Sequence, residues 1–139
     1  MNSTIRGKLD AAMAASPFIR LMGLRITALD AEKGELEMVL PHSAELMRAD
    51  DADGMFHGGA IATLIDTAGD FVVAAAVGGV VPTINFRVDY FRPGRGAQLR
   101  AVATARRIGR AVCVADVEVY GDDGKVCAIG RGTYSGVAG

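Results

Sequence analysis

Residues 56–70 read FHGGAIATLIDTAGD, an apolar run that opens on two glycines and carries a carboxylate about two helical turns further on. Desolvating a carboxylate is costly, so an apolar helix seldom holds an ionisable group without a use for it. The glycines at the helix start are expected to leave backbone N–H groups open to a ligand, at the positive end of the helix dipole. Gly58 and Asp66 thus place an anion-stabilising notch and a negative group on one rigid element, and this pairing indicates an enzyme.

The composition predicts one domain with its own hydrophobic core, because the chain has 139 residues and 50% of them are hydrophobic. Only 22% of the residues are charged and the formal net charge is −1, so the basic excess of a nucleic-acid-binding protein is missing. Tryptophan is absent and glycine occurs 18 times, which indicates a lean core. We expect self-association to supply further apolar burial.

The expected compartment is the cytoplasm. Cys113 and Cys127 lie in apolar, strand-like segments without the spacing of metal ligands, which favours free thiols in a reducing environment. The first eight residues lack the apolar segment of a signal peptide. The apolar stretch over 60–81 is long enough to span a membrane, but Asp66 and Asp70 lie within it and argue against a span. We therefore expect no membrane partner.

Periodicity and turn residues predict two helices and six strands. The helices are expected over 4–15, ended by Pro17, and over 58–77, ended by Gly78-Gly79. The strands are expected over 24–29, 34–40, 84–90, 99–106, 111–120 and 126–134. Short turns link the last four strands, so these are expected to be antiparallel neighbours. A helix that is apolar nearly all round must be wrapped on most sides. The expected fold class is α+β: a curved antiparallel sheet wrapped around a long central helix. It forms a single domain over 1–139, with an N-terminal helical extension over 1–20.

Two motifs carry a family resemblance. Residues 57–59 are His-Gly-Gly, and Leu-Ile-Asp follows at 64–66. The segment over 83–93 is a strand that ends in aromatic-x-Pro. In spacing and element order these segments resemble the hotdog-fold thioesterases of the phenylacetate-degradation type, which hydrolyse acyl-CoA thioesters. The resemblance covers roughly residues 21–135.

The resemblance implies a homodimer, which many relatives pair into a homotetramer, with two active sites between protomers. The Gly58 N–H would come from one chain and polarise the thioester carbonyl of the acyl-CoA substrate. Asp66 would come from the other chain and either attack that carbonyl, giving an anhydride, or take a proton from water. A plainer interpretation of Asp66 is a helix carboxylate that is exposed or paired with an arginine. The absence of charge clusters in the presumed pocket favours an apolar or aromatic acyl group.

Four further residues have both a functional and a structural interpretation. His57 is either a catalytic base or, as the resemblance implies, an orienting group that fixes the loop and contacts substrate near the carbonyl. Gly59 allows close approach of the substrate to the backbone or serves helix-start geometry. Thr83 matches a Ser/Thr position that could orient water or Asp66, although a β-branched residue opening a strand needs no such role. Asp70 is a second pocket carboxylate or a solvated group, and a neighbouring carboxylate would raise its pKa.

One position departs from the family pattern. Relatives usually carry Asn or Gln six residues before the histidine, and this chain has Asp51 there. An ionised carboxylate accepts hydrogen bonds but cannot donate one, and close to Asp66 it would repel that group or force one of the pair to stay protonated. Asp51 therefore has a base-like role, or the chemistry is slower or different, or the acidic loop is simply solvated.

Arginines at strand ends are candidates for the phosphates of CoA, because the planar guanidinium suits phosphate oxygens. They are Arg92, Arg95, Arg106, Arg107 and Arg110. No metal-ligand spacing and no dinucleotide fingerprint occurs, so neither a metal nor a cofactor is expected. Two alternative functions stay open: a hotdog-fold enoyl-CoA hydratase or dehydratase, whose Asp and His spacing is not found here, and a non-catalytic acyl-CoA-binding protein, which the acidic residue at position 51 keeps open.

Overall fold

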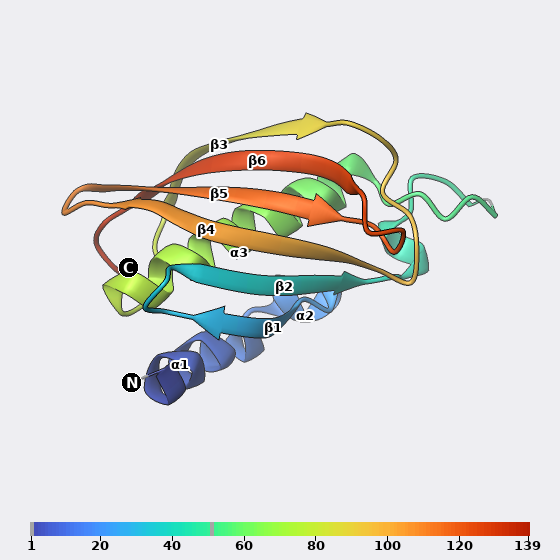
Figure 1. Cartoon of the computed structure of the whole chain (residues 1–139). Helices are drawn as coiled ribbons and strands as arrows, with labels where there is room; N and C mark the ends of the chain where they lie inside the picture. Colours follow the sequence, from blue (N-terminus) through green and yellow to red (C-terminus); the bar gives the residue numbers. More distant parts are fainter. Residues whose placement is uncertain (1, 51) are drawn as a thin grey trace.

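A long helix lies against one face of a six-stranded antiparallel sheet that curves around it (Figure 1). The computed structural model describes residues 2–50 and 52–139. The elements in chain order are α1 (Asn2–Ala15), α2 (Pro17–Met22), β1 (Arg25–Asp30), β2 (Glu35–Pro41), the 3-10 helix η1 (Ala44–Leu46), α3 (Gly58–Val77), β3 (Thr83–Tyr90), β4 (Gln98–Ile108), β5 (Val112–Tyr120) and β6 (Val126–Ser135).

The strand order in the sheet is β1-β2-β4-β5-β6-β3, with every pair antiparallel. The expected neighbour relation is confirmed for β4 with β5 and for β5 with β6. It is wrong for β3 and β4, because β4 pairs with β2 and β3 pairs with β6 at the far edge. The connection over 91–97 is therefore a crossing and no tight hairpin turn. It carries the chain from one edge of the sheet to the strand beside β2 (Figure 1).

Helix α3 has the bounds that its flanking residues predict. His57 caps its first turn, and Gly78 ends it in the left-handed conformation with φ 97°, donating its N–H to the carbonyl of Ala74. Ten residues of α3 are buried, chiefly against the concave face of the sheet. By length and hydropathy alone α3 would also suit a membrane span; in this fold it is the core helix.

The N-terminal extension holds two helices where one was predicted. Pro17 does end the first helix, but it also begins a second, because proline is favoured in the first turn of a helix. Ser16 caps α2 by accepting a hydrogen bond from the Ile19 N–H at 3.2 Å. Gly23 ends α2 in the left-handed conformation. The two helices lie beside β1, at the opposite edge of the sheet from β3 (Figure 1).

Strand β3 is an edge strand with apolar side chains on its surface. Ile84 is 55% exposed, and Phe86 and Tyr90 are also exposed, although the alternation of the strand predicts one apolar face. The free edge presents a row of backbone N–H and C=O groups, which is a template for pairing with another strand. Strand β3 thus carries apolar side chains that the fold of one chain does not bury.

Candidate active site

Asp66 lies in the middle of α3 and is held from the start of β3. The hydroxyl of Thr83 donates to Asp66 Oδ1 at 2.8 Å, across a 17-residue separation that the turn after α3 closes. Burial raises the pKa of the Asp66 carboxyl, and the hydrogen bond from Thr83 offsets part of that rise. Asp66 is therefore neither a solvated helix carboxylate nor one that an arginine neutralises.

Asp70 lies one turn further along α3 and is anchored in the same manner. The Val81 N–H donates to Asp70 Oδ1 at 3.3 Å. Burial raises the pKa of Asp70 to about 7, the Val81 hydrogen bond opposes that rise, and the nearby negative charge of Asp66 adds to it. The spacing of the two carboxylates predicts that their mutual repulsion raises the pKa of Asp70, but burial is the larger cause of the rise.

Each of these carboxylates has one anchored oxygen and one that is open. In the described part of the chain, Thr83 and Val81 are the partners of the Oδ1 atoms, and the Oδ2 atoms have none. No buried side-chain oxygen of the described residues lacks a hydrogen-bond partner, so both Oδ2 atoms are accessible. Asp66 and Asp70 both line a cavity of about 440 Å³, within the usual range for small-molecule sites. Its lining is otherwise largely apolar: Ala12, Ser16, Phe18, Ile19, Ala62, Thr63, Thr67, Phe71, Val80 and Phe86.

A buried tyrosine fixes the backbone of α3 at Asp66. Tyr134 of β6 is fully buried, and its hydroxyl donates to the Asp66 carbonyl oxygen at 3.1 Å. Gly69 and Gly132 make room for its ring, because a Cβ at either position would collide with it. Burial, and then the charges of Asp66 and Asp70, raise the pKa of Tyr134 well above its ordinary value. Sequence reasoning missed Tyr134; a glycine inside the apolar helix and another in the closing strand were the available signals.

The start of α3 offers one open amide where two were expected. The Gly59 N–H donates to His57 Nδ1 at 2.8 Å, so it is not available to a ligand, and the expectation that both glycine amides are open is wrong. The Gly58 N–H has no acceptor among residues 2–50 and 52–139. Because His57 Nδ1 accepts, the neutral ring carries its proton on Nε2, an arrangement that suits an orienting group better than a base.

Tyr90 is a second tyrosine that sequence reasoning missed. It extends from the end of β3, and its hydroxyl donates to the carbonyl oxygen of Gly58 at 2.6 Å. A Cβ atom at position 58 would lie in van der Waals contact with the ring of Tyr90. The edge strand thus positions both the carboxylate of Asp66, through Thr83, and the start of α3, through Tyr90.

Gly58 and Asp66 of one chain cannot act on the same carbonyl. Eight residues separate them along a continuous helix, which corresponds to about 12 Å along its axis. An attacking carboxylate and an oxyanion donor must both lie about 3 Å from the reacting group. Within one chain, these two groups therefore do not form one complete site of this kind.

The arginine candidates lie at two ends of the sheet. Arg92 and Arg95 line a hollow of about 430 Å³ on the connection between β3 and β4, where the Phe56 N–H donates to the carbonyl of Gly94 and ties this loop to the start of α3. Arg95 also forms an ion pair with Asp53 at 3.4 Å. Arg107 and Arg110 follow at the other end of β4, roughly 30 Å away along the strand. Asp51 lies outside the described residues.

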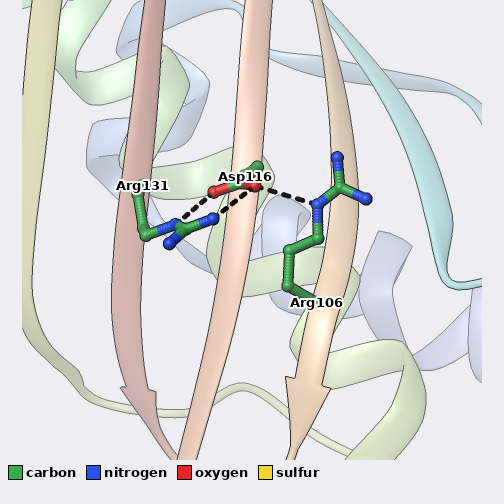
Figure 2. A network of polar contacts seen from close by, with 3 residues as sticks. All are labelled: Arg106, Asp116 and Arg131. Carbon is green, nitrogen blue, oxygen red and sulfur yellow. Dashed lines mark hydrogen bonds and ion pairs between the residues drawn. The ribbon is translucent and has the colours of Figure 1, made fainter.

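Arg106 is engaged on the sheet face that points away from α3. Its Nε donates to Asp116 Oδ2 at 2.9 Å, and Arg131 donates to both oxygens of the same carboxylate, at 2.6 and 2.9 Å (Figure 2). The hydrogen bonds from Arg131, and then the one from Arg106, lower the pKa of Asp116 against the effect of burial. This cross-strand network joins β4, β5 and β6, so Arg106 has a structural partner already.

Comparisons with known proteins agree with this fold. A profile described as the thioesterase superfamily matches residues 53–128. A relative from Halobacterium salinarum is 36% identical and covers 90% of this chain and 91% of its own length. The medium/long-chain acyl-CoA thioesterase YigI of Salmonella typhimurium is 30% identical, with 85% of this chain and 84% of that protein covered.

Two solved structures extend the comparison. A member of the thioesterase superfamily superimposes with a TM-score of 0.87 at 32% identity, covering 95% of this chain and 98% of that one. The Escherichia coli PaaI protein, from the phenylacetic acid degradation operon, has the same fold with a TM-score of 0.83 at 23% identity, covering 97% and 94%. The chain belongs to the thioesterase superfamily. Its fold class is the predicted hotdog fold, and its predicted enzyme class, thioester hydrolase, is confirmed.

Proposed function

We propose that the protein hydrolyses acyl-CoA thioesters with an apolar or aromatic acyl group, giving the free acid and CoA. The observation that carries the proposal is the carboxyl of Asp66, which Thr83 holds by one oxygen and which lines a largely apolar cavity. A relative whose name describes a medium/long-chain acyl-CoA thioesterase supports the substrate class.

Asp66 acts in one of two ways. Its free oxygen attacks the thioester carbonyl, the C–S bond breaks, the thiolate of CoA leaves and takes up a proton, and water then hydrolyses the mixed anhydride. Alternatively, the carboxylate takes a proton from a water molecule that attacks the carbonyl directly. A pKa raised by burial favours both roles, because it makes the carboxylate more basic near neutral pH.

The oxyanion that forms on the carbonyl is stabilised by the Gly58 N–H of a second copy of the chain. The separation of about 12 Å within one helix supports a site shared between two chains. The exposed apolar edge strand β3, which carries Thr83 and Tyr90, supports a homodimer in which this edge is covered. Pairing of two dimers into a homotetramer is an extension that rests on the family resemblance. One preorganised donor of this kind contributes about 3–4 kcal/mol to transition-state stabilisation.

Arg92 and Arg95 are the arginines that we assign to the phosphates of CoA. Their loop is hydrogen-bonded to the residue before His57, so they lie at the same end of the sheet as the oxyanion donor. Gly59 contributes to this end through its contact with the His57 ring, and Asp70 contributes a second carboxyl to the cavity wall.

Thiol release from a panel of short-chain, long-chain and aromatic acyl-CoAs tests the proposal, with enoyl-CoA hydration followed in parallel by ultraviolet absorbance. We expect thiol release without hydration, and a loss of at least about a hundred-fold in kcat for Asp66→Asn. Binding of acyl-CoA without turnover would instead identify a non-catalytic binding protein. Turnover that survives Asp66→Asn would remove this residue from the mechanism.

A further inference from the structure

The cavity beside Asp66 has one wall that comes from outside the region that the superfamily profile matches. The superfamily profile begins at residue 53, whereas the elbow between α1 and α2, residues 12–19, supplies four lining residues. Helix α3 forms the floor with both carboxylates, and β3 with the turn before it supplies Val80 and Phe86. The elbow and β3 lie at opposite edges of the sheet, so the cavity runs across the exposed side of α3 between them.

The elbow is an ordered part of the fold. Leu9 and Met13 of α1 belong to the hydrophobic core. The side chain of Arg20 donates to the carbonyl of Ala14 at 2.7 Å, across the bend, and Arg6 donates to the carbonyl of Ile26 at 2.8 Å, which ties α1 to β1. With the Ser16 cap, these contacts give the lining side chains of the elbow a fixed position relative to α3.

We propose that this elbow is the selectivity wall of the acyl pocket, and that Phe18 and Ala12 set the size of the acyl group that the enzyme takes. The inference rests on the proposed function, since the occupant is the acyl group of the thioester whose carbonyl is attacked by Asp66 or by the water that Asp66 deprotonates. Phe18 keeps 54% of its surface exposed although it lines the cavity. An acyl chain lying across α3 would cover that ring. Ala12, one turn before Ser16, leaves space that a larger side chain would fill.

The chemistry of the other lining groups agrees with an apolar occupant. Ile19, Phe71 and Val80 offer apolar surface, and the hydroxyl of Ser16 is already used as a helix cap. Each methylene that leaves water for such a surface changes affinity roughly four-fold. A change in the length of the pocket therefore shifts the preferred chain length rather than the rate for all substrates alike.

Two variants change the size of the pocket in opposite directions. Phe18→Ala enlarges the pocket, and Ala12→Leu fills part of it. We measure kcat/KM for wild type and variants on saturated acyl-CoAs of increasing length. The expected result is an optimum that moves to longer chains in Phe18→Ala and to shorter chains in Ala12→Leu, by roughly four-fold in relative kcat/KM for each methylene. Matched controls are Leu21→Ala, which lies on α2 at 71% exposure, and Ala11→Leu on α1; both lie outside the cavity lining, and neither should alter the profile.

The outcomes separate this inference from the proposed function. If the wild type releases thiol but both wall variants keep its chain-length profile, or lose activity equally on all chains, the selectivity wall is wrong and the hydrolase stands. If no acyl-CoA is hydrolysed by the wild type, both fail. Size-exclusion chromatography with light scattering accompanies the kinetics: a change in oligomeric mass in Phe18→Ala alone would show that the elbow is a subunit contact and overturn the inference. Should Ala12→Leu fail to fold, the profile of Phe18→Ala decides.

Discussion

The hydroxyl of Tyr134 donates a hydrogen bond to the backbone carbonyl of Asp66, from a ring that is wholly buried between the sheet and α3. The carboxylate that we assign to catalysis is therefore fixed at its backbone from β6 and at its side chain from β3. Because both strands belong to the rigid sheet, the position of the carboxylate does not depend on a loop. Preorganisation of this kind lowers the cost of reaching the reactive geometry.

Replacing Tyr134 by phenylalanine tests this relationship. The Asp66 carbonyl keeps its helical hydrogen bond, so the loss of the phenol should cost about 1 kcal/mol of unfolding free energy, with a fall in kcat and little change in KM. Urea unfolding and thiol-release kinetics measure the two effects. Tyr120→Phe is the control, because that hydroxyl makes no hydrogen bond to any described residue. Equal effects of the two substitutions would contradict a positioning role for Tyr134.

Thr83→Val removes the donor to Asp66 while keeping the shape of the side chain. The hydrogen bond from Thr83 lowers the pKa of Asp66 against the effect of burial, so its loss should raise that pKa further. The acidic limb of the kcat/KM profile is then expected at higher pH than in the wild type, with a loss of roughly ten-fold at neutral pH, typical of a hydrogen bond to a charged group. Thr83→Ser keeps the hydroxyl and should restore the wild-type profile. An unshifted limb in Thr83→Val would remove this hydrogen bond from the mechanism.

Asp70 makes the stability of the protein depend on pH. Its pKa is about 7 in the folded chain, above the ordinary value of 3.8, so the folded state binds more protons than the unfolded state between these values. The unfolding free energy should therefore fall as pH rises through that window, by about 2–3 kcal/mol from pH 5 to pH 8. Urea unfolding at the two pH values measures the fall, and Asp70→Asn should remove most of it. A variant with the same pH dependence as the wild type would place the titrating group elsewhere.

His57 is predicted to act as a helix cap and not as a proton carrier. His57→Ala leaves the Gly59 N–H without its acceptor and should lower stability by about 1 kcal/mol. Asparagine is a favoured N-cap residue, so His57→Asn should recover that stability. If the histidine only orients, the asparagine variant also keeps the pH profile of the wild type, as followed by thiol release. Disappearance of one limb of that profile in His57→Asn would show that the ring transfers a proton.

Local signals in the sequence were sufficient for the long elements of the fold, and they were insufficient for one strand pairing and for the short helix α2. Helix α3 has its predicted bounds because Gly58 and Gly78 mark its ends chemically. The position of β3 was wrong because turn residues report that a chain bends, whereas the choice of β2 as the partner of β4 depends on contacts between distant segments. The second N-terminal helix was missed because proline both ends one helix and begins the next.

The same division holds for the site. Asp66 could be found from one apolar helix with a carboxylate in it, and Thr83 from its place in the motif, since both signals lie within short segments. The tyrosines were missed, because Tyr134 and Tyr90 reach α3 from elements that are distant in the sequence. The error over Gly59 was of another kind: the flanking histidine supplies a ring nitrogen that competes with any ligand for this amide.

If the site is shared between two chains, two inactive variants should restore each other's activity, which a site within one chain would not allow. Gly58→Pro removes the oxyanion donor, and proline suits the first position of a helix. Asp66→Asn removes the carboxylate. Each variant alone should be inactive, but chains of the two co-expressed should form mixed dimers with one intact site each.

Random pairing makes about half of the dimers mixed, with one of two sites restored, so thiol release should recover to about a quarter of the wild-type value. The two variants purified separately and mixed without subunit exchange are the control and should stay inactive. If co-expression restores nothing while both variants fold and assemble, Gly58 and Asp66 do not complete each other across two chains, and the oxyanion of the reaction is stabilised by some other group.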